Sequence, residues 1–333
     1  MSTRFVSRAV VLASGMLMFI GCSGPPSVAQ LAGSWEAVVT EGSPQPRAEN
    51  AFVELDGLMY LIGGGPDRID IYDPETNTWT TGAAVPEPVH HFQAVAYDGK
   101  IYVVGAWIGS YPRQDGITNV LIYDPAEDAW TTGPVIPEAR RRGSAGAVVY
   151  DDQIYVVGGN VGGHGPHATA VGWLDRFDPQ TGEWEEMPTA ARRRDHFQAA
   201  LIDGRIYAAA GRTSDIEGYI DSTVSAVDVF DIESETWSTV SGAPIPTERA
   251  GTPTAAVGEY VIVTGGEGFG AAWAETEALN TETGQWELIG MLNQERHGTQ
   301  MFYYDGRLWI AGGAAAQAGG RRLVELEVFT FDD

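Results

Sequence analysis

An eight-residue motif recurs along the chain and restricts its possible folds more than any other feature. It reads YDPETNTW at 72–79, YDPAEDAW at 123–130, FDPQTGEW at 177–184, FDIESETW at 230–237 and LNTETGQW at 279–286. The tryptophans of these octets, together with Trp35, are separated by 44, 51, 54, 53 and 49 residues. A nearly constant spacing of this length is typical of a chain built from one repeated structural unit.

The octet is the last part of a longer unit. Each unit begins with an arginine, except in the second unit, where Val89 takes its place; the arginines are Arg47, Arg142, Arg194, Arg249 and Arg296. An apolar stretch then leads to a tight turn, as in QAVAYDGKIYVVG at 93–105. Asp-Gly between two alternating runs predicts a β-hairpin, and Asp-Pro in the octet predicts a second one. We therefore expect four antiparallel strands per unit and almost no helix.

The series of arginine, Asp-Gly, Ile-Tyr-Val-Val-Gly-Gly, Tyr-Asp-Pro and tryptophan resembles the kelch-repeat family. The resemblance covers residues 34–333 and implies a β-propeller with one four-stranded blade per repeat. We expect an all-β, six-bladed propeller. A sixth octet starts as FDD at 331–333 without its tryptophan, while SWEAV at 34–38 carries Trp35 without preceding strands. Joining the two would close the last blade with an N-terminal strand and remove the open edges of the stack.

The first thirty-three residues are expected to lie outside the propeller. Two arginines precede an apolar run at 9–20 that is too short for a permanent transmembrane helix. Residues 1–21 are thus interpreted as a signal peptide and residues 22–33 as a tether. Cys22, the one cysteine, follows Phe-Ile-Gly in a segment that resembles a bacterial lipobox, which implies lipidation. An exported protein anchored in the bacterial envelope is expected, or a secreted one if Cys22 is not lipidated.

Charge narrows the range of partners. The formal net charge is −25, which argues against nucleic acid or anionic lipid as a general partner. Contact with a membrane is expected only through a lipid on Cys22. No nucleophile, base and orienting acid occur at a recognisable spacing, and no cofactor motif is present. We expect a monomer without catalytic residues, cofactor or metal.

The two faces of the predicted propeller differ. The short turns lie on one face, and long, variable loops at 106–119, 160–172, 212–224, 267–275 and 314–322 lie on the other, where binding normally occurs. Most of the arginines fall on this long-loop face. Two roles stay open for Arg142, Arg194, Arg249 and Arg296. They could hold neighbouring blades together, or they could bind an anion through their guanidinium groups.

Further candidates lie in the channel and the long loops. Gln93, Gln198 and Gln300 recur in alternate blades, and His91 and His196 occupy equivalent positions, so these side chains could orient a polar ligand or line a hydrated channel. Trp107, Tyr111 and Trp273 could stack on a sugar or fold back onto their own loops. His164 and His167 have no obvious third ligand, and we predict no metal site there.

Two functions from different classes remain. The first is a non-catalytic binding or scaffolding module whose ligand is a protein or an anionic carbohydrate on the long-loop face. The second is an enzyme on an acidic sugar, because some exported bacterial kelch propellers are sialic acid mutarotases and an arginine-rich mouth suits acid–base ring opening of a carboxylated sugar.

Overall fold

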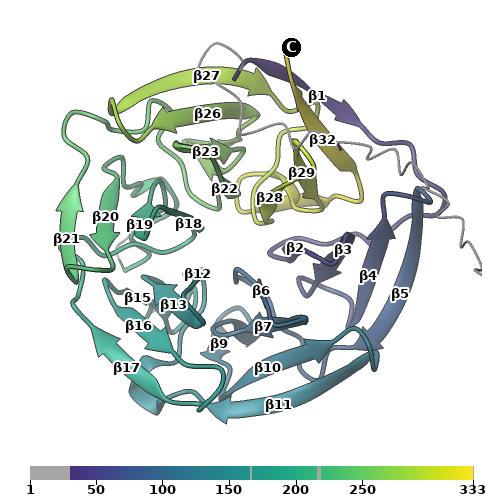
Figure 1. Ribbon diagram of the computed structural model, residues 1–333, viewed down its shortest axis with the longest axis horizontal. Helices are drawn as coiled ribbons and strands as arrows, with labels where there is room; N and C mark the ends of the chain where they lie inside the picture. The colour runs from purple at the N-terminus through teal and green to yellow at the C-terminus, as the bar shows by residue number, and fades with distance from the viewer. Residues whose placement is uncertain (1–30, 166, 216–218, 333) are drawn as a thin grey trace, which may run out of the picture.

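The computed structural model describes residues 31–165, 167–215 and 219–332, and it forms a ring of six four-stranded antiparallel sheets (Figure 1). In each blade the first strand lies nearest the axis and the octet tryptophan lies on the outermost strand. The predicted all-β six-bladed propeller is confirmed. Within the described residues the helical content is limited to two single 3₁₀ turns, η2 (Glu138–Arg140) and η3 (Tyr219–Asp221).

The strands follow one another from the axis outward. Blades one to three consist of β2 (Ala51–Leu55), β3 (Leu58–Ile62), β4 (Arg68–Asp73) and β5 (Thr78–Ala84); β6 (Val95–Tyr97), β7 (Lys100–Val103), β10 (Asn119–Asp124) and β11 (Ala129–Val135); and β12 (Gly146–Tyr150), β13 (Gln153–Val157), β16 (Leu174–Phe177) and β17 (Trp184–Met187). Blades four to six consist of β18 (Ala199–Ile202), β19 (Arg205–Ala208), β20 (Asp228–Asp231) and β21 (Thr236–Thr239); β22 (Thr254–Val257), β23 (Tyr260–Thr264), β26 (Glu275–Asn280) and β27 (Gln285–Met291); and β28 (Met301–Tyr304), β29 (Arg307–Ala311), β32 (Leu326–Phe331) and β1 (Gly33–Ala37).

The sixth blade combines segments from both ends of the described chain. Strand β1 pairs antiparallel with β32, with Trp35 opposite Phe329 and Gly33 opposite Phe331. In the complete octets the tryptophan lies opposite the first residue of the octet, as Trp79 lies opposite Tyr72 and Trp286 opposite Leu279. Phe329, and not Phe331, is therefore the sixth equivalent of Tyr72. The sequence alignment that started the last octet at FDD was wrong by two residues, because it followed the Phe-Asp pair instead of the strand register.

The octet tryptophans also connect the blades. Each described pair of octet aromatics packs closely, with ring centroids 5.2 Å apart for Tyr72 and Trp79. The indole Nε1 of Trp237, in the fourth blade, donates at 2.7 Å to the carbonyl of Pro188, which directly follows the last strand of the third blade. Trp35 Nε1 donates to the hydroxyl oxygen of Thr276 in the fifth blade, at 2.8 Å. The octet aromatics thus pack within their own blade, and the indole N–H groups of Trp237 and Trp35 bond to the chain of the preceding blade or to the segment that follows it.

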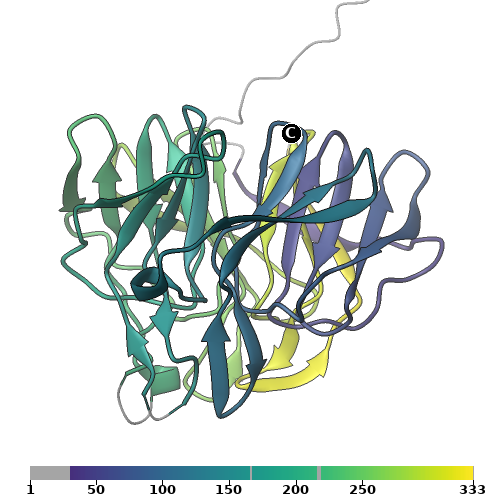
Figure 2. The ribbon, with the colours of Figure 1, turned by 90° about the horizontal axis from the view of Figure 1, so that it is seen from below.

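The long loops build the second face of the ring. Four of the five form short hairpins that project beyond the blades (Figure 2): β8 (Trp107–Ser110) with β9 (Arg113–Gly116), β14 (Asn160–Val161) with β15 (Thr169–Ala170), β24 (Glu267–Gly268) with β25 (Ala271–Ala272), and β30 (Ala314–Ala316) with β31 (Gly319–Arg322). The octet turns and the last residues of β32 lie on the opposite side. No helix within the described residues has the length and apolar character needed to cross a membrane.

Candidate functional site

Six residues, one from the start of each blade, form a ring around the propeller axis. The backbone N–H of each donates to the carbonyl of its counterpart in the preceding blade, with N···O distances between 2.5 and 3.0 Å, so that the six bonds close a circle. All six have a left-handed backbone, with φ between 53° and 65°. The members of this axial ring are Glu49, His91, Ser144, His196, Gly251 and Gly298.

The axial ring carries polar side chains where glycine would be less strained. A left-handed backbone costs a residue other than glycine about 1 kcal/mol or more, and such strain clusters at functional sites. Gly251 and Gly298 avoid this strain, whereas Glu49, His91 and His196 accept it. A Cβ atom on Gly298 would lie 2.6 Å from the carboxyl group of Glu49, so the glycine also leaves room for that side chain. The strained residues point to a site at the axis.

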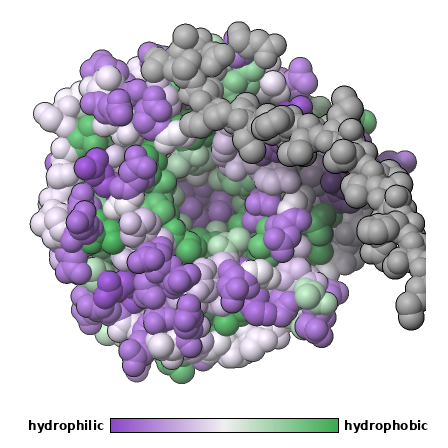
Figure 3. Space-filling model, in the orientation of Figure 1, coloured by the Kyte–Doolittle hydropathy of each residue, from purple (hydrophilic) through white to green (hydrophobic). Residues whose placement is uncertain are grey.

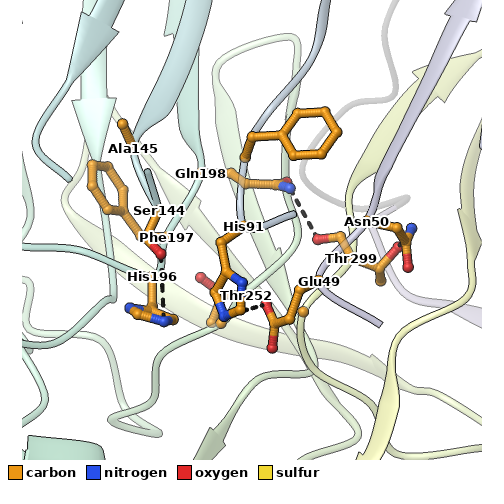
Figure 4. A pocket seen from close by; sticks show the side chains of 13 residues that line it. Glu49, Asn50, His91, Ser144, Ala145, His196, Phe197, Gln198, Thr252 and Thr299 are labelled. Atoms are coloured by element: carbon orange, nitrogen blue, oxygen red, sulfur yellow. Dashed lines mark hydrogen bonds and ion pairs between the residues drawn. The ribbon is translucent and has the colours of Figure 1, made fainter. Parts of the chain in front are cut away.

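A pocket of about 330 Å³ opens from the axial ring into the long-loop face. Its polar lining comes from all six blades and is formed by Glu49, His91, His164, Arg212, Glu267 and His297. Tyr111 and Arg322, both on hairpins of the long-loop face, also line it. We call this space the central pocket. A smaller cavity of about 30 Å³ lies against the same ring and is lined by Glu49, His91, His196 and Gln198, among others (Figure 4).

Three histidines converge at this place. The ring centroids of His91, His164 and His196 are 5.0 to 5.2 Å apart, in an almost equilateral triangle. One ring nitrogen from each lies within 4.8 Å of the corresponding nitrogens of the other two. The buried indole of Trp107 packs against all three, with centroids 4.8 Å, 5.0 Å and 5.6 Å away, and its Nε1 donates to the carbonyl of Asn160. The sequence analysis considered His164 together with His167 as possible metal ligands, but His167 is exposed on the β14–β15 hairpin.

Charged groups surround the histidines. Arg212 Nη1 donates to Glu267 at 2.5 Å, and Arg212 Nε lies 3.9 Å from Asp195. His297 Nε2 lies 3.4 Å from both Glu49 and Glu267, and so links the two carboxylates. The result is a connected set of two carboxylates, one imidazole and one guanidinium on the wall of the central pocket.

Burial and charge set opposite protonation states in this group. Burial lowers the pKa of His164 to about 4, assisted by the positive charge of Arg212, and lowers the pKa of His91 and His196 well below the usual value. Burial also acts on His297, but its hydrogen bond to Glu49 and the charge of Glu267 raise its pKa. Burial opposes ionisation of Glu49, yet the imidazoles of His91 and His297 hold its pKa well below the usual range. The histidine triangle is therefore neutral near pH 7, beside an ionised Glu49.

The three glutamines of alternate blades bond across the channel. Gln93 Oε1 accepts from the backbone N–H groups of Ala147 and Ala199 at 2.8 and 2.9 Å, and Gln198 Nε2 donates to the carbonyl of Thr299 at 2.9 Å. Gln300 completes the triangle through the N–H and carbonyl of Ala94. We call these contacts the glutamine triangle. The three side chains are buried and committed to backbone groups, so they brace the channel; viewed down its axis the molecule is hollowed at the centre (Figure 3).

The four candidate arginines are committed to contacts inside their own blades. Arg142, Arg194, Arg249 and Arg296 are at most 3% exposed, and each binds backbone carbonyls and a carboxylate of its own blade. Their carboxylate partners are Asp175, Asp228, Glu277 and Glu327. These guanidinium groups are already neutralised inside their own blades and do not line the central pocket. Their role is structural, but their side chains stabilise single blades and do not link neighbouring ones.

The carboxylate partners were missed in the sequence although a signal was present. An acidic residue stands two positions before the residue opposite the tryptophan in five units, at Asp70, Asp175, Asp228, Glu277 and Glu327. In the second unit, where Val89 replaces the arginine, the equivalent residue is Leu121. The acid and the arginine are thus present together or absent together.

The remaining candidates lie in different places. Tyr111 is 73% exposed at the tip of the β8–β9 hairpin and borders the central pocket. Trp273 is half-buried after β25, where its backbone carbonyl accepts from Arg296, and it lines neither cavity. Cys22 and the predicted signal lie outside the described residues. Arg212, Glu267 and Glu49 were not singled out from the sequence, because their repeat positions carry no shared residue type.

The fold and the site define a six-bladed propeller with a polar pocket on its axis, and comparison with known proteins agrees. The chain matches the KLHDC2/KLHL20/DRC7 kelch-repeats domain over residues 30–211 and again over residues 147–333. It therefore belongs to the kelch-repeat family, whose members are commonly protein-binding scaffolds.

Individual relatives cover the chain to different extents. Kelch-like protein terF of Aspergillus terreus is 30% identical over 94% of this chain and 71% of its own length. Alpha-scruin of Limulus polyphemus is 25% identical over 60% of this chain, and kelch-like protein 26 of Danio rerio is 27% identical over 70%. The match spans only 22% and 38% of those two proteins. The solved structure of YjhT superposes with a TM-score of 0.73 over 88% of this chain and 99% of its own, at 17% identity, which shows a shared fold.

Proposed function

We propose that this protein is a binding propeller that holds a small carboxylated sugar in the central pocket. The observation that carries the proposal is the lining of this pocket, where guanidinium, imidazole and carboxylate groups meet in about 330 Å³. Pockets of about 300 to 1,000 Å³ with a few convergent polar groups are typical of small-molecule sites.

Different residues of the central pocket suit different groups of a carboxylated sugar. Arg322 is exposed on β31 and suits the carboxylate of the ligand, since guanidinium groups bind carboxylates through paired hydrogen bonds. Glu49 and Glu267 can accept from sugar hydroxyls. Tyr111 at the mouth offers an aromatic face for the sugar ring.

The same proposal places the propeller outside the cell, exported and tethered through a lipid on Cys22. Strand β1 begins at Gly33, opposite Phe331, on the side of the octet turns. Residues 23–33 would extend at most about 36 Å, at about 3.3 Å per residue. A tether that enters on this side would turn the central pocket away from the membrane.

Binding is tested by thermal shift and calorimetry with sialic and uronic acids, in the presence of EDTA. We expect Arg322→Ala to weaken binding at least tenfold, because it removes a charge-assisted contact worth about 1.5–3 kcal/mol. Arg321→Ala is the matched control: it is the neighbouring exposed arginine, and it pairs with Glu325 at 2.7 Å instead of lining the pocket. Equal affinities for the two variants, or no binding by the native protein, would contradict the proposal.

A second candidate is ring opening of the same sugar by acid–base catalysis. It is favoured by the Glu49–His297 pair, in which an ionised carboxylate and an imidazole of raised pKa face one pocket. Such a pair can remove a proton at one oxygen and supply one at another. NMR exchange spectroscopy on the anomers of sialic acid tests this: exchange must be accelerated by the native protein and slowed again by Glu49→Gln.

A further inference from the structure

We propose that His91, His164 and His196 form a binding site for a divalent transition-metal ion of the Zn²⁺ type. The inference goes beyond the proposed sugar binding and does not rest on it. Its basis is the geometry of three imidazoles that come from three different blades and meet on the axis.

The spacing of the three rings fits a tetrahedral ion. Nitrogen ligands about 2.0–2.1 Å from Zn²⁺ at tetrahedral angles lie about 3.3 Å from one another, and their ring centroids lie about 5 Å apart. His164 Nε2 and His196 Nε2 are 3.1 Å apart, and the three centroid distances are 5.0 to 5.2 Å. All three ligand nitrogens lie within 4.8 Å of one another, so binding one ion requires only a short closing movement of the side chains.

Hydrogen bonds fix which nitrogen of His196 and of His164 carries the proton. His196 Nδ1 donates to Asp195, whose carboxylate also accepts from Ser214 Oγ at 2.6 Å. His164 Nδ1 lies 3.0 Å from Gln114 Oε1, an oxygen identified by the backbone N–H of His164 that it also accepts. In both neutral rings Nε2 therefore carries a lone pair.

The same reasoning applies to His91. His90 Nε2 lies 3.0 Å from the carbonyl of Gly109, which can only accept, so this nitrogen carries the proton of a neutral ring. His90 Nδ1 then accepts from His91 Nδ1 at 2.6 Å, which leaves the lone pair of His91 on Nε2. Three Nε2 lone pairs converge, and a cation between them converts a repulsive arrangement into three coordinate bonds.

The surroundings of the triangle meet the other needs of a metal site. Asp195 behind His196 supplies the carboxylate–histidine contact that commonly orients a metal ligand. Glu49 Oε2 lies 3.5 Å from His91 Nε2 and adds negative charge (Figure 4). Ser144 Oγ, 3.4 Å from His196 Nε2, and Arg212 Nη2, 3.3 Å from His164 Nε2, would give up these contacts to the ion. The charge of Arg212 is balanced by Glu267.

The central pocket leaves a fourth coordination position accessible. His91 and His164 both line it, so a water molecule or a ligand from the long-loop face can reach the ion. Three histidines with an open fourth position are typical of a catalytic type of zinc site, whereas structural sites are closed by four protein ligands. An all-imidazole set also suits Cu²⁺ and Ni²⁺.

Zinc binding is measured by titrating Zn²⁺ alone, without sugar, into the full-length protein freed of metal with EDTA. We expect one ion per chain, a higher melting temperature with Zn²⁺, and at least a hundredfold weaker binding by His164→Ala. His167→Ala is the matched control, because it removes an exposed imidazole from the same hairpin and should bind like the native protein. Asp195→Asn should weaken binding about 10–100-fold.

The outcomes separate the proposals. His164 is a half-buried hairpin residue, so circular dichroism and the melting temperature without metal will show that His164→Ala is folded. Absence of stoichiometric Zn²⁺ binding, or an equal loss in His164→Ala and His167→Ala, would overturn the metal site. The sugar titration in EDTA is unaffected by that result, so either proposal can fail alone.

Discussion

At the scale of single residues, the octet is a turn stabilised by its own side chain. Asp178 Oδ1 accepts from the backbone N–H groups of Gln180 and Thr181 at 2.8 and 3.2 Å. These hydrogen bonds favour the ionised carboxylate and lower the pKa of Asp178. In the fifth octet Asn280 makes the same two contacts, to Glu282 and Thr283, without a charge. The motif thus requires an acceptor oxygen at this position and tolerates either residue.

This difference predicts a change in acid stability. A carboxylate with a depressed folded-state pKa stabilises the fold above its unfolded value of about 3.9, and this contribution is lost as the pH falls through the folded value. Asp178→Asn should therefore keep the urea midpoint of the native protein at pH 7 and lose less of it between pH 5 and pH 3. The reciprocal change Asn280→Asp should increase the loss over the same range. Identical pH profiles for the three proteins would contradict this account.

The residues of the site show what the sequence can reveal at this scale. His91 and His196 were recognisable because they occupy equivalent repeat positions. Glu49 occupies the same position in the first blade, two residues after the repeat arginine, but it was not recognised because it is a glutamate and the other two residues are histidines. Arg212 and Glu267 each directly follow the glycine-pair position of their unit, but the residue type at this position differs from unit to unit, so repeat alignment does not single them out. Their contact exists only because the ring brings the loops to one axis.

At the scale of elements, the innermost strands depend on the glutamine triangle. Gln198 Oε1 accepts from the N–H of Thr254 in the fifth blade, and its Nε2 donates to Thr299 beside the sixth blade. The alternation of glutamines in blades two, four and six was visible in the sequence. Their partners were not, because backbone atoms 56 and 101 positions away leave no side-chain signal.

Removal of one glutamine should therefore destabilise the whole ring. Gln198→Ala leaves a buried N–H and a buried carbonyl without their partners, and each such group costs about 1–3 kcal/mol. Gln285→Ala, on the exposed outer strand β27, is the control and should change the free energy of unfolding by less than about 0.5 kcal/mol. Urea unfolding of both variants measures the difference. Equal stability would show that water replaces the glutamine without cost.

At the scale of the whole molecule, the sixth blade joins residues that are far apart in the chain. Trp35 is 4% exposed, packs on Phe329 with ring centroids 5.4 Å apart, and bonds to Thr276 of the neighbouring blade. The six-bladed count followed from the repeats, since each octet marks one outer hairpin. The register of the last sheet did not, because the partial octet offers two Phe residues two positions apart that could each face Trp35.

Trp35→Ala tests the importance of this contact for the ring. Loss of a buried tryptophan typically costs about 3–5 kcal/mol, and here an indole hydrogen bond between blades is lost as well. Val39→Ala is the control, because Val39 lies close by in sequence and is 88% exposed. Chemical unfolding should show a lower midpoint for Trp35→Ala alone. A midpoint unchanged from that of Val39→Ala would mean that the first strand adds little to the stability of the ring.

The glutamine triangle also has a kinetic consequence. The buried amide groups of Gln93, Gln198 and Gln300 cross the channel, so we expect the central pocket to open only toward the long-loop face. A second ligand molecule can then enter only after the first has dissociated through the same opening. The rate of ligand exchange would then equal the dissociation rate of the bound ligand and would not rise with the concentration of free ligand.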